Sequence, residues 1–409
     1  MSDHNHTLSA TELTRRAAIT TGMVALATPA LMRMASAQPT PFVVDVPDST
    51  LRDMRARLSA ARLPDQIPGS GWSYGTDTTY LSELITYWQT DHDWPSEQAR
   101  LNGVSHGKAD IDGLGLHFVH ARSDQPDAIP LLMLHGWPSS FVQMLDIIPM
   151  LTSPSGDNPA FHVVAASLPG YGFSDIPNST GLSPAAIAPY MHRLMTESLG
   201  YARYGVRSSD LGAGIAATMA ATYGEAIIGS HTGGTNPYLG PDIPQDLSPE
   251  EQAFVQTAQS WMAQEMGYAI VQSSKPQTLA VALNDSPAGL ASWIIEKFWR
   301  WTDHDGTIES AINRDALLTN LTIYWATQTI NPSMRLYAEA ARAPASWAPP
   351  QVPVGYLMPV NDLFETPRSW IERHGPVAHW TRSDVGGHFM EWEQPQIVAE
   401  DLRVFFSAL

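Results

Sequence analysis

The sequence predicts an α/β fold, in which helices flank a mostly parallel β-sheet. Short apolar segments alternate with loops and helical segments after residue 129, and this alternation is typical of a parallel sheet. The strand pattern stops between Tyr238 and about Ser346, where long aromatic-rich helical segments replace it. We therefore expect a helical lid inserted into the sheet. The predicted strands are 130–134, 161–166, 204–207, 354–358 and 378–380.

The part of the chain before this sheet has a mixed pattern and little visible chemistry. Apolar residues recur at helical spacing in 51–58 and 81–88, and residues 111–120 are typical of a hairpin that turns at Gly113 or Gly115. We expect a leader, an N-terminal extension domain, a first part of the sheet domain, the lid, and a second part of the sheet domain. Their predicted ranges are 1–37, 38–125, 126–240, 241–346 and 347–409.

The composition sets limits on the protein class. With 409 residues, 44% of them hydrophobic, the chain can bury a sizeable core in one large domain with insertions or in two domains. Asp and Glu number 41 against 23 Lys and Arg, so the protein's field repels phosphates and we expect no nucleic-acid partner. Because the chain has no cysteine, disulfides, a thiol nucleophile and thiolate metal ligands are excluded.

The first 37 residues are typical of an export signal. Thr14-Arg15-Arg16 precedes a modestly apolar run over 17–31, and Ala35-Ser36-Ala37 matches a cleavage site. The paired arginines favour the twin-arginine route, so we expect a protein that is exported to the periplasm or secreted. The run is too short and too polar for stable membrane insertion. The alternative is an amphipathic or disordered tail with a chance arginine pair.

A candidate nucleophile lies in Ser208-Ser209-Asp210-Leu211-Gly212, between a predicted strand and a helix of small residues. The nucleophile elbow of α/β-hydrolases needs small residues two positions before and two after the nucleophile, because the turn is too tight for larger side chains. Ser208 and Gly212 meet this requirement only if Asp210 is central. A serine nucleophile at Ser209 would place Arg207 and Leu211 at the crowded positions.

Two other interpretations of this segment remain. Asp210 could cap the following helix, which by itself is an equally good explanation. The run from Gly212 to Ala217 also loosely matches a dinucleotide-binding fingerprint, which is a weak signal so far into the chain.

A glycine turn follows the strand that ends at Leu134. It can direct backbone N–H groups above the sheet, so we predict the amides of Trp137 and Leu211 as oxyanion donors. His135 in the same loop could be mistaken for a catalytic base. We interpret it instead as a histidine fixed by hydrogen bonds within the loop.

The last two predicted strands are followed by Asn361-Asp362 and by Gly386-Gly387-His388. The order nucleophile, acid, histidine along the chain is the order that α/β-hydrolases use. We therefore predict that His388 activates water and that Asp362 orients the imidazole and stabilises its charged form.

Several long motifs occur in order along the chain. They are HGWPSS at 135–140, LPGYGFSD at 168–175, SKPQTLAVALNDSPAGLASWIIEKF at 274–298 and GGHF at 386–389. Shorter ones precede them: Arg62-Leu-Pro-Asp65, Tyr80-Leu-Ser-Glu-Leu84, Tyr87-Trp88, Asp93-Trp94 and Leu101-Asn102. Together they resemble the microsomal-type epoxide hydrolase family over nearly everything after Pro41.

This resemblance implies an α/β-hydrolase that converts a small apolar epoxide and water into a vicinal diol, with no metal and no organic cofactor. It also implies two lid tyrosines that bind the epoxide oxygen, at the positions of Tyr268 and Tyr337. Tyr324 lies near the second position and is the alternative to it. Without the resemblance, core packing would be the first explanation for any of these tyrosines. The sequence leaves open whether the protein forms a homodimer.

The chain departs from the family pattern beside the nucleophile. The family usually has two glycines before it and a tryptophan after it, where this chain has Ser208, Ser209 and Leu211. A backbone donor survives a change of side chain, so we expect the chemistry to persist and the substrate range to differ. One alternative is a haloalkane dehalogenase, but Leu211 cannot supply a halide-binding indole. Another is a non-catalytic protein that binds small ligands, which the intact set of acid, base and nucleophile disfavours.

Overall fold

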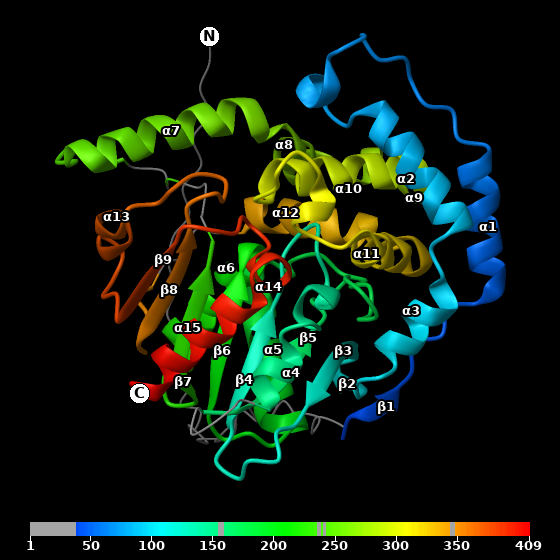
Figure 1. The fold of residues 1–409 in the computed structure, drawn as a ribbon. Coiled ribbons are helices and arrows are strands. Elements are labelled where there is room, and N and C mark those ends of the chain that lie inside the picture. Colours follow the sequence, from blue (N-terminus) through cyan, green and yellow to red (C-terminus); the bar gives the residue numbers. More distant parts are fainter. Residues whose placement is uncertain (1–37, 154–158, 235–238, 240–242, 344–347) are drawn as a thin grey trace, which may run out of the picture. The chain divides into compact units, whose positions relative to one another are not determined.

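The computed structural model describes residues 38–153, 159–234, 239, 243–343 and 348–409 (Figure 1). The predicted export signal over 1–37 lies outside the described residues. Nine strands of the described chain form one sheet in the order β1-β2-β3-β5-β4-β6-β7-β8-β9. The six strands from β5 to β9 in this order run parallel to one another. Strands β1, β2 and β3 are antiparallel to their neighbours and join the sheet at its β5 edge. The predicted α/β-hydrolase fold is therefore confirmed.

The strand bounds confirm the five predicted strands and the hairpin. Sequence reasoning missed β7, because its central Ser230 and His231 are polar although both are buried. The strands are β1 (Thr40–Phe42), β2 (His106–Ile111), β3 (Leu114–Ala121), β4 (Ile129–Leu134), β5 (Phe161–Ala166), β6 (Tyr204–Ser209), β7 (Ile227–Gly233), β8 (Val354–Pro359) and β9 (His379–Ser383).

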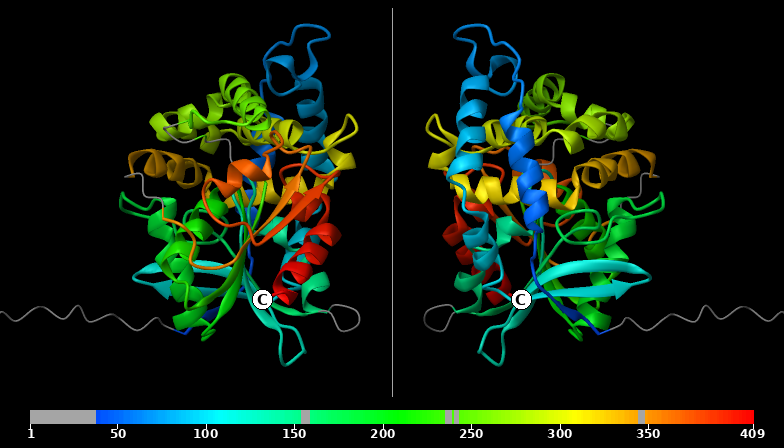
Figure 2. Two further views of the ribbon diagram at one scale, coloured as in Figure 1. Left: turned by 90° about the vertical axis from the view of Figure 1, so that its left-hand side faces the viewer. Right: turned by 90° about the vertical axis from the view of Figure 1, so that its right-hand side faces the viewer.

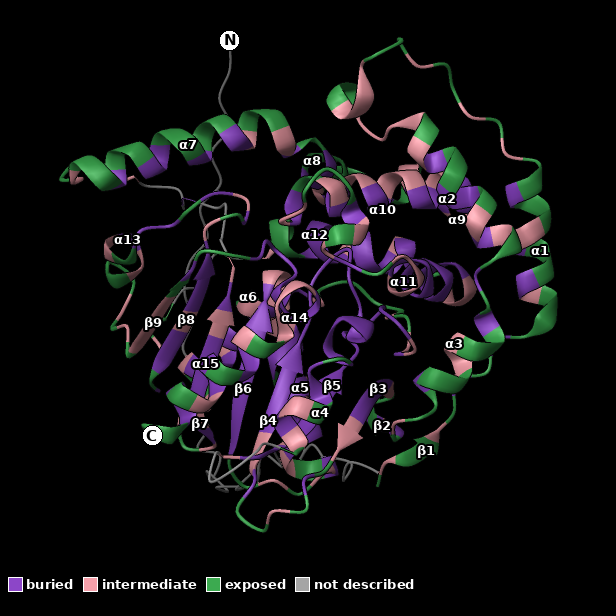
Figure 3. Ribbon diagram, in the orientation of Figure 1, coloured by how far each residue is buried: buried purple, intermediate pink, exposed green. Residues whose placement is uncertain are grey.

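Helices cover both faces of the parallel sheet (Figure 2). Alternate residues of a strand point to opposite faces of the sheet, so the helices on each face pack against a different set of side chains. A Cβ atom at Gly205 would lie 2.5 Å from the Phe406 ring of α15, whereas the next residue back, Tyr204, faces His192 of α5. One face carries α4 (Ile148–Thr152), α14 (Met390–Glu393) and α15 (Pro395–Ser407), and the other carries α5 (Pro184–Arg193) and α6 (Asp210–Thr222). Strand β6 is buried along its whole length (Figure 3).

The predicted lid is helical, and its helices lie beyond the carboxyl ends of the parallel strands (Figure 1). Its first helix begins at a capping box, in which Ser248 and Glu251 exchange side-chain and backbone hydrogen bonds. The lid helices are α7 (Pro249–Glu265), α8 (Gly267–Ser274), α9 (Pro276–Asp285), α10 (Pro287–Trp301), α11 (Arg314–Thr327) and α12 (Ile330–Arg342). Within the described ranges, no helix combines the length and apolar character that a membrane crossing requires.

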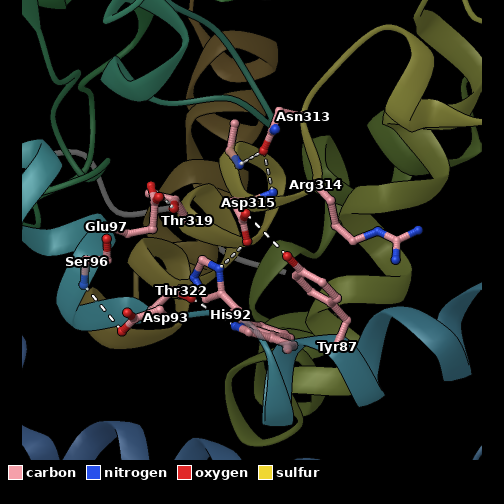
Figure 4. A network of polar contacts seen from close by, with 12 residues as sticks. Tyr87, His92, Asp93, Ser96, Glu97, Asn313, Arg314, Asp315, Thr319 and Thr322 are labelled. Carbon is pink, nitrogen blue, oxygen red and sulfur yellow. Dashed lines mark hydrogen bonds and ion pairs between the residues drawn. The ribbon is translucent and has the colours of Figure 1, made fainter.

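The N-terminal region supplies three helices as well as β1 to β3, and these helices hold lid helix α11 (Figure 4). His92 contacts Asp315 at 3.0 Å, and the Thr319 hydroxyl donates to Glu97 at 3.0 Å. The buried Trp88 indole N–H donates to the Thr322 hydroxyl, also at 3.0 Å. The helices are α1 (Asp48–Ser59), α2 (Thr78–Thr90) and α3 (Trp94–Leu101).

The turn between β6 and α6 brings two backbone segments into close contact. A Cβ atom at Gly212 would lie 2.6 Å from the Leu134 carbonyl oxygen and 2.8 Å from that of His135. Both neighbours are backbone atoms at the end of β4, so neither can move aside like a flexible side chain. Glycine at this position is therefore what allows the first turn of α6 to pack against β4.

We expect Gly212→Ala to destabilise the protein by roughly 1–3 kcal/mol, because the added methyl group overpacks a rigid contact. Gly214→Ala is the matched control on the same helix, since its Cβ would meet only Pro184 at an ordinary 3.7 Å. The control should be neutral or stabilise by up to about 1 kcal/mol through helix propensity. Chemical denaturation of both variants measures this, and equal stabilities would contradict the account.

Candidate active site

The predicted site residues follow four different strands of the parallel sheet. Trp137 lies in the loop after β4, Asp210 directly after β6, Asp362 after β8 and His388 after β9. Because the carboxyl ends of parallel strands meet at one edge, residues far apart in the chain come together there. The structure does bring these four residues together.

Asp210 occupies a strained turn that presents its carboxylate to the space above the sheet. Its φ is +50°, a left-handed conformation that is uncommon for residues other than glycine. Its Oδ1 accepts a hydrogen bond from the Trp137 backbone N–H at 2.9 Å. A Cβ atom at Gly136 would lie 2.1 Å from the same oxygen, so glycine there leaves room for the carboxylate. The Leu211 amide, in the first turn of α6, stays a predicted donor.

His388 lies between two carboxylates. Its Nδ1 is 2.8 Å from Asp362 Oδ1, and its Nε2 is 3.3 Å from Asp210 Oδ2. The imidazole side chain is 2% exposed and that of Asp362 is 0% exposed, whereas that of Asp210 is 18% exposed and accessible from solvent. Burial opposes the charged imidazole, but Asp362 and Asp210 outweigh it and raise the pKa of His388 to about 10. His388 is therefore cationic at neutral pH and donates to both carboxylates.

The turn that carries His388 is fixed by residues that the sequence analysis did not assign to the site. The His388 backbone N–H donates to the Trp301 carbonyl at 2.7 Å, and the Trp301 ring lies 5.3 Å from the imidazole, centroid to centroid. Glu393 accepts backbone N–H groups from both neighbours of His388, Gly387 and Phe389, at 2.8 and 2.9 Å. The available sequence signal was an acidic residue shortly after His388, Glu393, in a segment that also contains the apolar Met390 and Trp392.

The two predicted lid tyrosines lie beside the loop over 135–140, which we call the oxyanion loop because it contains the predicted donor Trp137. Tyr268 stacks on the Trp137 ring with centroids 5.2 Å apart and planes 10° from parallel, and Tyr337 meets both rings edge-on at 5.9 and 6.1 Å. Burial, and then the neighbouring Tyr268 and Asp210, hold the pKa of Tyr337 well above its ordinary value. The phenol therefore stays protonated and can donate a hydrogen bond.

Tyr324 and His135 both have partners that support the loop. The Tyr324 hydroxyl donates to the Ser139 carbonyl at 3.0 Å, and Asn320 from the same helix donates to the Pro138 carbonyl at 2.9 Å. His135 Nδ1 lies 3.0 Å from the Gly136 carbonyl, and its Nε2 accepts from the Leu168 N–H at 3.3 Å. Burial lowers the pKa of His135 to about 4, so it is neutral and fixed within the loop, as the sequence predicted.

One group of side chains in the described part of the chain, His231, His379 and Asp401, has the spacing of metal ligands. The atoms that would bind a metal already have partners, because both histidines contact the Asp401 carboxylate at 2.7–2.8 Å. The Arg207 guanidinium donates to His231 Nδ1 at 2.8 Å and would repel a cation. We interpret this group as a hydrogen-bonded cluster.

Sequence comparisons identify the family of the chain. Residues 39–144 match the family described as epoxide hydrolase N terminus, and residues 129–278 match the alpha/beta hydrolase fold. The protein from Stigmatella aurantiaca (strain DW4/3-1) named "Putative epoxide hydrolase" is 40% identical, over 90% of this chain and 85% of its own. "Epoxide hydrolase 1" of Sus scrofa is 33% identical, over 90% of this chain and 88% of its own.

The chain belongs to the epoxide hydrolase family. Solved structures of epoxide hydrolases share its fold. The juvenile hormone epoxide hydrolase of the silkworm Bombyx mori superposes with a TM-score of 0.81 at 32% identity, covering 91% of this chain and 95% of that one. The Aspergillus niger epoxide hydrolase has a TM-score of 0.80 at 27% identity, covering 91% and 97%.

The charge on His388 in this epoxide hydrolase depends on Asp210, which leads to a pH prediction. We expect Asp210→Asn to lower the pKa of His388 from about 10 toward the ordinary 6.5, because one of its two anionic partners is lost. The His388 pairing in the unsubstituted protein should stabilise the fold fully below pH about 6.5, and this stabilisation should disappear as the pH rises through about 10.

NMR titration of the His388 ring measures this shift. Asp315→Asn is the matched control, since it removes the carboxylate beside another buried histidine, His92, and should leave His388 unchanged. An equal pKa in Asp210→Asn and in the unsubstituted protein would show that the two groups are not coupled.

Proposed function

We propose that this protein hydrolyses epoxides to vicinal diols through an alkyl ester on Asp210. The observation that carries the proposal is the environment of one carboxylate: the Trp137 amide binds its Oδ1 at 2.9 Å, and its Oδ2 is 3.3 Å from the His388 imidazole. One oxygen is thus held for oxyanion stabilisation, while the other is the nucleophilic oxygen of the proposal, on a side chain that is 18% exposed.

In the first step, Asp210 Oδ2 attacks an epoxide carbon and the bond between that carbon and the ring oxygen breaks. Negative charge then develops on the ring oxygen, where the phenols of Tyr268 and Tyr337 donate hydrogen bonds and one of them supplies a proton. Buried phenols suit this task because they lose little solvation when they bind the oxygen, and burial keeps the pKa of Tyr337 well above its ordinary value. The product of this step is an ester that has no charge on Asp210.

In the second step, loss of that charge changes His388. With Asp210 esterified, only Asp362 still favours the imidazolium, so the pKa of His388 falls. The imidazolium then loses its Nε2 proton, which restores the phenol that supplied a proton in the first step, and the neutral Nε2 can accept a proton from water. The water attacks the ester carbonyl carbon, and the developing oxyanion on Oδ1 is stabilised by the Trp137 amide and by the predicted Leu211 amide. Such general-base assistance contributes about 10²–10⁴-fold to the rate. The bond between Asp210 Cγ and the ester oxygen then breaks, the leaving oxygen takes the proton that water gave to His388, and that proton is replaced from the new carboxyl group as the diol leaves.

The proposed function is tested with a panel of apolar epoxides and haloalkanes. We expect vicinal diols from epoxides and no halide release from haloalkanes. Halide release without diol formation would favour a dehalogenase, and no turnover of any compound would favour a ligand-binding protein. Asp210→Asn is the negative control and should form no diol.

The two lid tyrosines should affect ester formation and not the later step. We expect Tyr268→Phe and Tyr337→Phe each to slow ester formation by about 10²-fold, because each removes a donor to the developing charge. Rapid mixing with epoxide followed by mass spectrometry of the esterified protein measures this step.

Tyr324→Phe is the control for these variants, since its hydroxyl donates to the Ser139 backbone. It should cost about 1 kcal/mol of stability and leave ester formation within a few-fold. If Tyr324→Phe slowed ester formation as strongly as Tyr337→Phe, the assignment of the second tyrosine would be wrong.

A further inference from the structure

An ion pair lies directly beneath the proposed site and takes no part in the steps described above. Arg207 Nε donates to Glu391 Oε1 at 2.8 Å, and both side chains are 0% exposed. Arg207 lies in β6, three residues before Asp210, and Glu391 lies in α14, three residues after His388. The pair therefore joins the strand that carries the nucleophile to the segment that carries the base.

The same carboxylate also reaches the oxyanion loop. Glu391 Oε2 accepts a hydrogen bond from Gln143 Nε2 at 2.7 Å. Gln143 is itself buried, and it lies in the short helix η2 (Phe141–Met144), directly after the loop that carries Trp137. Glu391 thus contacts Arg207 on the strand that leads to Asp210, and Gln143 directly after the loop that carries Trp137. Glu391 itself lies in the segment that follows His388.

The guanidinium is fixed on its other side as well. Arg207 Nη1 can only donate, so His231 Nδ1 accepts this bond at 2.8 Å and His231 Nε2 donates to Asp401 at 2.8 Å. A Cβ atom at Gly233 would lie 2.4 Å from Arg207 Nη2, so the neighbouring strand has glycine where the guanidinium needs the space. The guanidinium is therefore held by hydrogen bonds through Nε and Nη1, while Nη2 is buried against Gly233 and has no hydrogen-bond partner among the described residues.

A fully buried ion pair contributes little net stability, because the cost of removing both charges from water offsets their attraction. Its directional hydrogen bonds, in contrast, restrict the movement of β6 and α14 relative to each other. We propose that the Arg207–Glu391 pair is a positioning device for the reaction, which keeps His388 Nε2 within reach of the Asp210 carboxylate. This inference rests on the proposed function, and the two residues act through Asp210 and His388 without contacting substrate.

The test compares an isosteric single variant, Glu391→Gln, with an apolar double variant, Arg207→Met with Glu391→Leu. We expect the double variant to stay folded, because removal of two buried charges offsets the hydrogen bonds that Gln143 and His231 lose. Hydrolysis of the Asp210 ester should nevertheless slow by about 10- to 100-fold in both variants, because small displacements of a general base reduce its rate by such factors. Ester formation should change by less than about threefold, so the ester accumulates.

The probe is styrene oxide, and mass spectrometry after rapid mixing gives the rates of the two steps. The matched control is Glu251→Gln, which weakens another glutamate–arginine pair on elements that carry none of the proposed catalytic residues. In that pair the buried Glu251 contacts the partly exposed Arg373 at 2.6 Å. It should lower the melting temperature without changing the ratio of the two rates.

A folded double variant that hydrolyses the ester at the unsubstituted rate overturns the proposal. If the double variant does not fold, the same result in Glu391→Gln overturns it.

A measurement without substrate separates this proposal from the proposed function. If His388 moves away from Asp210, its pKa falls in Glu391→Gln and in the double variant, and NMR titration detects this even if the protein opens no epoxide. An unchanged His388 pKa in both variants contradicts the positioning role. Failure of the unsubstituted protein to form the ester contradicts the proposed function instead.

Discussion

The site depends on the close approach of the turn at Asp210 to the loop after β4. Gly212 rests against the Leu134 and His135 carbonyls, and Gly136 leaves space for the Asp210 carboxylate, so neither segment can move without the other. This contact holds Asp210 in a left-handed conformation and places the Trp137 amide on its Oδ1. The strain at one residue is thus compensated by packing that also positions one of the two predicted oxyanion donors.

The remaining structure supplies charge control and rigidity around that turn. Two carboxylates that follow different strands, Asp210 after β6 and Asp362 after β8, contact one imidazolium. Esterification of Asp210 would remove one of the two charges and lower the pKa of the base. The N-terminal helices hold α11, and α11 in turn binds the Pro138 and Ser139 carbonyls of the oxyanion loop. A region with little visible chemistry of its own therefore helps to position the catalytic loop.

Local rules were enough to predict much of this arrangement. The small residues Ser208 and Gly212 located the turn, and the apolar strands with their following polar residues located Asp362 and His388. Strand β7 escaped prediction because its buried Ser230 and His231 are acceptable only with partners, such as Asp401, that come from distant segments. Arg207 stood in a predicted buried strand, yet its partner Glu391 lies 184 residues away and no local pattern connects them. Tertiary partners of buried polar groups were therefore the part that the sequence could not supply.

The central claim is that Asp210 attacks the epoxide and water attacks the resulting ester. It is tested most directly by a single turnover in ¹⁸O-water, followed by mass spectrometry of the peptide that contains Asp210. The ester route predicts that the label enters the Asp210 carboxylate, because water attacks the carbonyl carbon of the ester. Label that appears only in the diol on the first turnover would show direct attack of water on the epoxide and would contradict the account.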